Sequence, residues 1–146
     1  MSDAKISRIV VLGIGGVGEL AARLLHDSGF AVTGVDARDP QKPVPFVFEN
    51  ASVSDAEELD RALAGQDAVL SCLPYHLTKA VARTAAAQRL VYHAPTEDVP
   101  TTQLIMELAE TSTKLMAPQC VPAPGFIGFV GAHLAQAFDE LRSIKL

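Results

Sequence analysis

The chain has 146 residues, of which 49% are apolar and 20% are charged, and its net charge is −5. This size and composition are ordinary for one globular domain with its own core. The negative charge argues against binding to nucleic acid or to an anionic membrane surface, and no apolar run reaches the roughly 18 residues that a membrane helix needs. We therefore expect a cytoplasmic location with neither nucleic acid nor membrane as a partner.

The first predicted elements are a strand, a glycine turn, a helix and a second strand. Arg8–Gly13 has the apolar run of a buried strand, and Gly16–Ser28 has helical spacing and ends at Gly29. Ala31–Asp36 is the second strand. The turn between the first two elements reads Gly13-Ile14-Gly15-Gly16-Val17-Gly18, and the second strand ends in an acid, which together form a dinucleotide-binding fingerprint.

Each glycine of this fingerprint has a physical role. Gly13 lets the chain turn out of the strand, Gly15 lets the backbone approach a pyrophosphate, and Gly18 lets the helix pack closely on the strand. The free N–H groups at the start of the helix, together with its dipole, favour the negative charge of the phosphates. The carboxylate of Asp36 is expected to accept hydrogen bonds from the ribose hydroxyls of the cofactor.

The rest of the chain continues to alternate between strands and helices. The expected elements are a loop at Asp39–Pro45, a strand at Phe46–Glu49, a helix from the capping box Ser54–Glu57 to Gly65, a strand at Asp67–Cys72, a helix at His76–Gln88, a strand at Leu90–Tyr92, a helix from Asp98 to Thr111, a strand at Lys114–Ala117, a proline-rich loop at Pro118–Pro124 and a helix at Gly125–Arg142.

This order predicts an α/β fold. We expect one Rossmann-type doubly wound parallel sheet with strand order 3-2-1-4-5-6, in a single domain over residues 1–146. Ser143–Leu146 resembles the start of a further strand, so we also expect that a substrate domain is missing.

The remaining cofactor contacts are expected at the carboxyl ends of the strands. An acid at Asp36 favours the free ribose of NAD, whereas Arg38 could pair with the 2′-phosphate of NADP or remain solvated. We expect NAD, with NADP as the alternative. Four further residues are expected to line the adenine and nicotinamide ends of the site: Ser52, Val53, Leu73 and Pro74.

Three segments resemble the saccharopine dehydrogenase-like family: Asp67–Tyr75, Tyr92–Asp98 and Met116–Gly128. The resemblance implies an NAD(P)-dependent oxidoreductase that acts on C–N bonds of amino-acid substrates through an imine and a hydride transfer. It covers the nucleotide domain of the family, and it implies that a small amino-acid-like substrate binds to a further domain. Where the family usually has an aspartate, this chain has Ala94, and a family glycine is replaced by Val121.

No complete set of acid–base groups is visible in the sequence. Tyr75 and Cys120 are the candidate catalytic residues, and we expect the chain alone to bind cofactor without turnover. Tyr75 and Lys79 have the spacing of the pair in short-chain dehydrogenases, but they follow the wrong strand for that mechanism. We interpret His93 as structural and Cys72 as a buried thiol, and the scattered cysteines and histidines predict no metal site.

Two alternatives to an oxidoreductase stay open at this stage. One is a regulatory nucleotide-sensing module of the kind attached to potassium channels, which also pairs a glycine turn with an acid. The other is an inactive nucleotide fold that serves as an assembly surface. Glycines recur at Gly125, Gly128 and Gly131, and this spacing is explained by close helix packing, including that of a homodimer.

Overall fold

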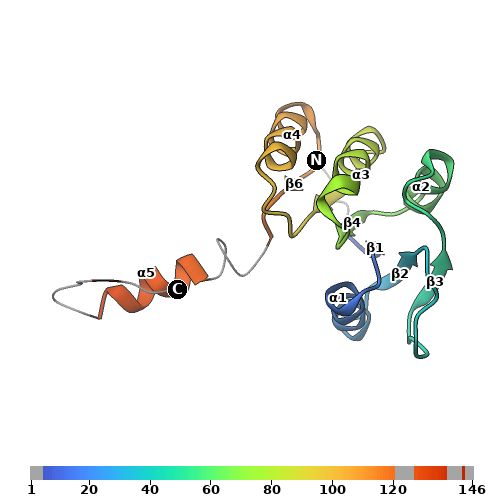
Figure 1. The fold of residues 1–146 in the computed structure, drawn as a ribbon, viewed down its shortest axis with the longest axis horizontal. Coiled ribbons are helices and arrows are strands. Elements are labelled where there is room, and N and C mark those ends of the chain that lie inside the picture. The colour runs from blue at the N-terminus through green and yellow to red at the C-terminus, as the bar shows by residue number, and fades with distance from the viewer. Residues whose placement is uncertain (1–4, 121–126, 138–142, 144–146) are drawn as a thin grey trace.

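The protein is described by a computed structural model over residues 5–120, 127–137 and 143. Its strands are β1 (Arg8–Leu12), β2 (Ala31–Asp36), β3 (Val47–Asn50), β4 (Ala68–Ser71), β5 (Val91–His93) and β6 (Met116–Ala117) (Figure 1). Its helices are α1 (Gly16–Asp27), α2 (Ala56–Leu63), α3 (Tyr75–Ala87), α4 (Val99–Thr111) and α5 (Ile127–Ala135).

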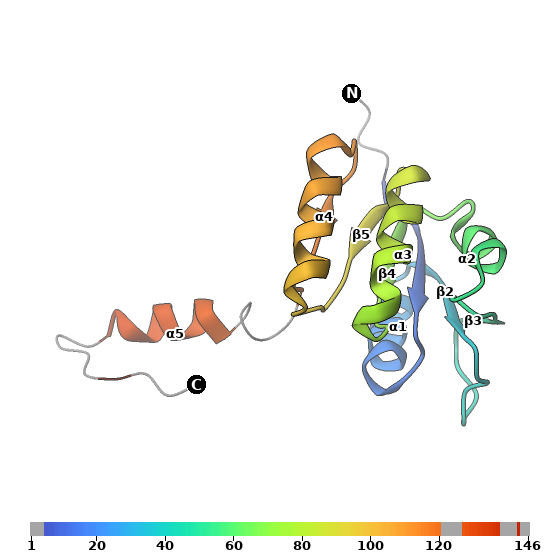
Figure 2. The same cartoon turned by 45° about the horizontal axis from the view of Figure 1, so that its top comes forward.

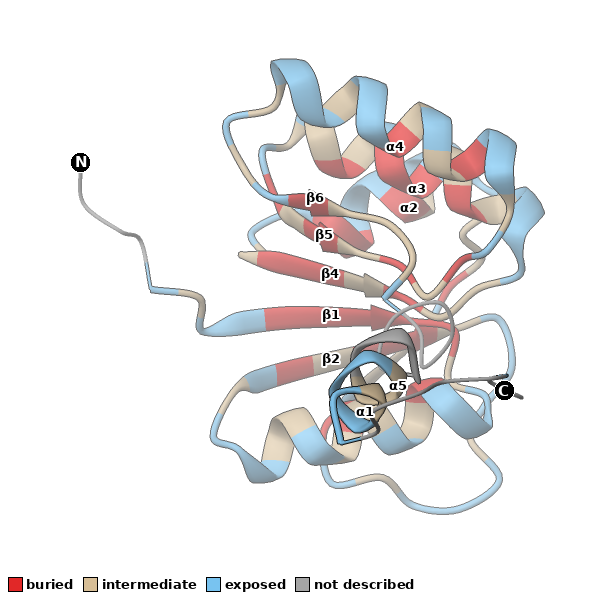
Figure 3. Cartoon of the chain, turned by 90° about the vertical axis from the view of Figure 1, so that its left-hand side faces the viewer, coloured by how far each residue is buried: buried red, intermediate tan, exposed pale blue. Residues whose placement is uncertain are grey.

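The six strands form one sheet in the order β3-β2-β1-β4-β5-β6, and every neighbouring pair is parallel. The predicted Rossmann-type sheet and its strand order are confirmed. Helices α2, α3 and α4 lie along one face, and α1 lies on the other (Figure 3). The strand order reverses between β1 and β4, which is the topological switch point of the sheet. Ligands of such folds bind beside this point, at the carboxyl ends of the strands.

The core is built from the two faces of the central strands. Val10, Leu12 and Val69 face α2 and α3, whereas Ile9 and Val11 face α1. Strands buried on both faces need continuous apolar runs, and this explains why β1 is apolar at every position after Arg8.

Helix α2 begins one residue later than the capping box Ser54–Glu57 predicted. Asp55 is the N-cap, and its carboxylate accepts hydrogen bonds from the N–H groups of Glu57 at 2.9 Å and Glu58 at 3.0 Å. Glu58 in turn accepts the Ser52 N–H at 2.6 Å. Aspartate is as good an N-cap as serine, so Asp55 caps α2 in place of the predicted Ser54.

Several boundaries differ from the predicted ones by one or two residues. Strand β3 covers Val47–Asn50 and α3 begins at Tyr75. Strand β6 begins only at Met116, because the Lys114 N–H bonds to the Ser112 hydroxyl at 3.1 Å in a bend before it.

The C-terminal predictions are only partly within the described residues. Of the helix predicted over Gly125–Arg142, α5 covers Ile127–Ala135. Ser143 lies in no strand, and residues 125–126, 138–142 and 144–146 lie outside the described residues. None of the described helices has the length and apolar character needed to cross a bilayer.

Asp67 joins the beginnings of the two central strands. Its Oδ2 accepts hydrogen bonds from Ser7 N, Ser7 Oγ and Arg8 N at 2.8–3.0 Å, and its Oδ1 accepts one from Arg8 Nη2 at 3.0 Å. The Arg8 side chain, followed by the Arg8 and Ser7 backbone amides, holds the pKa of the Asp67 carboxyl far below its ordinary value. The ionised carboxylate therefore stabilises the folded state.

We predict that Asp67→Asn lowers the melting temperature at neutral pH and flattens its dependence on acidity. A carboxyl whose pKa is depressed on folding contributes stability above its unfolded pKa, about 3.9, and loses it as the pH falls. Thermal melts between pH 7 and pH 3 should show the difference in melting temperature between wild type and variant begin to narrow as the pH falls through about 4. Asp27→Asn, at the exposed end of α1, is the control. A constant difference between Asp67→Asn and wild type at every pH would contradict this role.

Candidate functional site

The glycine turn joins the end of β1 to the start of α1. Gly13 has a φ of +86°, which only glycine adopts without strain, and its N–H bonds to Val35 O at 2.8 Å. A Cβ on Gly18 would collide with the Gly13 carbonyl oxygen, whereas a Cβ on Gly15 would meet nothing within 4 Å. Gly18 is therefore required by packing, and Gly15 leaves a space open in front of the helix.

The start of α1 has no side-chain cap. Gly15 is the N-cap residue, and no side chain bonds to the first amides of the helix. The N–H groups of the first helical turn have no partner within a helix. The turn thus presents backbone donors and the positive end of the helix dipole to the space in front of Gly15.

Asp36 at the end of β2 is tied to this turn. Its Oδ2 accepts the Ile14 N–H at 2.8 Å, and its Oδ1 accepts the Arg38 N–H at 3.0 Å. The Asp36 side chain is 15% exposed, whereas that of Arg38 is 89% exposed with its Nε 3.9 Å from Oδ1. The carboxylate is held in a fixed position at the edge of the site, and the guanidinium extends into solvent.

A cavity of about 300 Å³ lies at the carboxyl ends of the strands. Eight of the twelve residues predicted to bind cofactor line it: Gly13, Gly15, Asp36, Arg38, Ser52, Val53, Leu73 and Pro74. Ile14 and Gly16 line a second hollow on the outer side of Asp36. Val17 and Gly18 line neither, because Val17 is exposed on α1 and Gly18 is buried beneath the turn.

Sequence reasoning did not find several other residues of the cavity. They are Val35, Ala37, Ala51, Ser54, Cys72 and Leu77. Cys72, interpreted above as a buried thiol, is half-buried and lines the cavity, and burial raises the pKa of its thiol. A position at a strand end could have identified Val35, Ala37, Ala51 and Cys72, whereas Ser54 lies in the turn before α2 and Leu77 lies in α3, where the sequence carries no such signal.

Gly34 in β2 is a further residue that the sequence did not single out. A Cβ there would lie 2.7 Å from the Phe46 ring and 2.9 Å from Ile14 Cδ1. Because Gly34 has no side chain, the Ile14 side chain can pack against this part of β2. This packing supports the position of the Ile14 amide.

Three of the nine residues that line the outer hollow are acidic. Glu19, Asp36 and Asp39 face it together with Arg38. Glu19 is paired with Arg23 at 2.8 Å, and Asp39 accepts a hydrogen bond from the Asn50 amide at 2.9 Å. Arg38 is the one cationic side chain among the residues that line this hollow.

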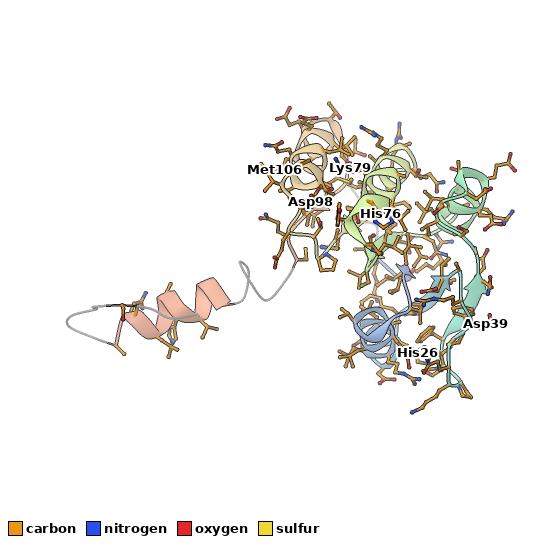
Figure 4. All side chains as sticks on the ribbon, viewed as in Figure 1. His26, Asp39, His76, Lys79, Asp98 and Met106 are labelled. Carbon is orange, nitrogen blue, oxygen red and sulfur yellow. The ribbon has the colours of Figure 1, made fainter. Side chains whose placement is uncertain are left out.

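Tyr75 lies apart from the main cavity. It is the first residue of α3 and is exposed, in a cleft lined also by Leu73 and by residues Pro95–Asp98. Lys79 lies one turn further along the same helix, near Asp98 at the start of α4 (Figure 4). The Tyr75–Lys79 pair therefore follows β4, and of the two only Tyr75 lines this cleft.

Cys120 is in contact with His93, which the sequence analysis interpreted as structural. The Cys120 Sγ lies 3.5 Å from His93 Nδ1 at the carboxyl ends of β5 and β6. Burial raises the pKa of the Cys120 thiol and lowers the pKa of the His93 imidazole. Both groups are therefore neutral at neutral pH, and neither shares a pocket with Tyr75. Within the described residues, no three metal-ligating side chains come together.

Ala94 occupies the position where the resembling family usually has an aspartate. Its side chain has no exposed surface, and its backbone bonds to Ala117 and to Cys120 N at 3.1 Å each. This position is filled by core packing and supplies no acid or base.

Comparison with family models gives a match over residues 9–115 to the saccharopine dehydrogenase NADP binding domain. The chain belongs to this family. The match runs from β1 to the residue before β6 and so includes the glycine turn, Asp36 and the main cavity. A search of curated protein sequences finds no match.

Solved structures with the same fold include saccharopine dehydrogenase (L-Glu forming) from Saccharomyces cerevisiae. It is 19% identical, with a TM-score of 0.71 over 90% of this chain and 31% of the yeast chain. A short-chain dehydrogenase/reductase superfamily protein from Agrobacterium tumefaciens with bound NAD is 23% identical, with a TM-score of 0.52 over 60% of this chain and 31% of its own. The chain thus spans about a third of each of these proteins.

The saccharopine dehydrogenase NADP-binding family implies a nicotinamide dinucleotide, and the residues present fit one. The open space at Gly15, the uncapped start of α1 and the fixed Asp36 carboxylate are the features that a pyrophosphate and a ribose require. The apolar residues Val53, Leu73 and Leu77 supply surface for the flat rings.

We predict that Gly15→Val weakens NADH binding at least tenfold, about 1.4 kcal/mol, without unfolding the protein. The new side chain has room in the free protein but fills the space in front of α1. Calorimetric titration measures the affinity and thermal melts measure the fold. Ala87→Val, at the exposed end of α3, is the matched control.

Gly18→Ala is expected to destabilise the fold, because its Cβ would collide with the Gly13 carbonyl oxygen. This variant should melt at a lower temperature. Unchanged NADH affinity in a folded Gly15→Val variant would show that the pyrophosphate does not lie at this turn.

Proposed function

We propose that this chain holds NAD for an oxidoreductase that transfers hydride at an amine or imine carbon of an amino-acid-like substrate, in the cytoplasm. The observation that carries the proposal is the fixed Asp36 carboxylate beside the open space at Gly15. The bound nicotinamide would supply the hydride chemistry. The residues of this chain bind and orient the dinucleotide.

The charges around Asp36 favour NAD over NADP. An acid at this place bonds the free 2′-hydroxyl of the ribose. A 2′-phosphate would meet the Asp36 carboxylate, with Glu19 and Asp39 in the same hollow, and Arg38 as the only cation among the lining residues. Arg23 is paired with Glu19 at 2.8 Å and bonds the Pro43 carbonyl at 3.1 Å, so it offsets the charge of Glu19 and leaves the carboxylates of Asp36 and Asp39 to disfavour a 2′-phosphate.

The chemistry at a C–N bond is proposed from the family and from the cleft beside β4. Family membership supports an oxidoreductase over a nucleotide-sensing module or an inactive assembly domain. Tyr75 and residues Glu97–Asp98 line the cleft next to the main cavity, and their carboxylates are suited to a cationic amine. The match covers about a third of the yeast enzyme. In this proposal, the groups that bind the substrate carboxylates and the acid–base group belong to the other two thirds of such an enzyme.

We expect NADH to bind more tightly than NADPH, and Asp36→Ser to narrow or reverse that preference. Removing the carboxylate removes the charge that faces the 2′-position. Fluorescence titration of both reduced cofactors measures the ratio of affinities, and Asp27→Ser, which removes the same charge from the far end of α1, should leave the ratio unchanged. Tighter binding of NADPH to the wild-type chain would mean that Arg38 outweighs Asp36 and would reverse the proposed cofactor.

We also expect that the chain alone does not turn over. Tyr75 and Cys120 lie in separate places, the His93–Cys120 pair is neutral, and Ala94 replaces the family's carboxylate. General acid–base catalysis requires a group within hydrogen-bond reach of the proton. The assay follows reduced cofactor absorbance with a panel of amino acids and keto acids. Steady turnover that is lost in Tyr75→Phe or Cys120→Ser would show that this chain carries the acid–base group.

A further inference from the structure

The two faces of the sheet are covered unequally. Helices α2, α3 and α4 pack along one face, but α1 is the only described helix packed on the other face, where it lies against β1 and β2 (Figure 3). A parallel sheet is normally covered by helices on both faces. The face of β4 and β5 beside α1 is therefore a part of the core surface that lacks a covering layer among the described residues.

This uncovered face forms an apolar groove of about 220 Å³, which we call the open groove. Its floor is formed by Ile9, Leu70 and Val91, its wall by Leu25 and Phe30, and its carboxyl end by His93. Leu20 and Leu24, four residues apart on α1, form an exposed apolar flank of that helix.

Helix α5 is an apolar element that, among the described residues, stands apart from the sheet (Figures 1 and 2). Its sequence Ile-Gly-Phe-Val-Gly-Ala-His-Leu-Ala has one polar side chain in nine residues. It stands away from the sheet in two views, and Leu134 is 57% exposed (Figures 1 and 2). A helix of this length is marginal in water by itself, and a helix that is apolar all round is normally buried.

The chain leaves the sheet next to the groove. Cys120, the last described residue before α5, contacts His93 at the carboxyl end of the groove. The six residues between Cys120 and Ile127 reach at most about 25 Å when extended, and a nine-residue helix is about 14 Å long. The connection is thus long enough for α5 to lie over β4 and β5 of its own chain.

We propose that α5 docks into the open groove of its own chain and completes the second helical layer of the sheet. The helix and the groove are both apolar. The segment that leads to α5 starts at Cys120, beside the carboxyl end of the groove. Docking would cover Leu70 and Val91 and bring α5 alongside the exposed flank of α1.

The test uses the absence of tryptophan from the chain. Leu134→Trp places a single reporter on α5, and Met106→Trp, at an exposed position of α4 away from the groove (Figure 4), is the exposed control. We expect the reporter on α5 to emit at a shorter wavelength than the control and to be less quenched by iodide. The emission should be independent of concentration in a protein that sediments as a monomer.

Variants of the groove should release α5. Leu70→Gln and, as a milder change, Phe30→Ala are expected to shift the reporter to longer wavelength, whereas Val47→Gln on the exposed edge strand should not. Circular dichroism and NADH binding confirm that each variant used is folded. Emission equal to the control, a short wavelength that persists in folded groove variants, or a short wavelength that appears only with dimer formation would each overturn docking within one chain; the last would identify a second copy as the occupant.

Discussion

The hydrogen bond from the Ile14 amide to the Asp36 carboxylate ties the glycine turn to the end of the neighbouring strand. It fixes two groups that a dinucleotide needs at a set distance, the uncapped start of α1 and the acid beside it. Gly18 against the Gly13 carbonyl and Gly34 beneath Ile14 leave no room for a side chain, so the turn has one arrangement. The cavity at the strand ends takes its shape from this constraint.

Much of the fold could be predicted from the sequence because its signals are local. Apolar runs, the glycine turn and the caps determine where each element begins, and alternation of strands and helices then restricts the strand order. Asp36 was predicted at the tip of β2 for the same reason. The error at α2 was also local, because Ser54 and Asp55 are both good caps and only the folded chain shows that Asp55 accepts the bonds.

The contacts between distant segments could not be predicted. His93 and Cys120 lie 27 residues apart and meet because β5 and β6 are neighbours in the sheet. Ser54 and Leu77 come to the cavity from two different loops and helices. Neither periodicity nor a motif predicts these contacts between distant residues. A sequence pattern predicts only the edge of the sheet at which they occur.

The main cavity at the glycine turn fits the family's cofactor better than the cleft at Tyr75 fits the family's reaction. The turn, Asp36 and the apolar surface for the rings are all present, whereas Ala94 fills the place of a carboxylate with core packing. The exposed cleft holds the Tyr75 hydroxyl and the carboxylates of Glu97 and Asp98, but within the described residues no base is hydrogen-bonded to that hydroxyl. Cofactor binding is therefore the function that the geometry supports most strongly.

The central claim is tested most directly by following the backbone amides of the ¹⁵N-labelled chain by NMR while NADH is added. We predict the largest shifts at Ile14–Gly18, Arg38 and Ser52–Ser54, with little change at Ser7, Arg8 and Asp67 on the opposite edge of the sheet. Saturable shifts confined to the opposite edge or to the open groove, or no shifts at millimolar NADH, would contradict a dinucleotide site at the glycine turn.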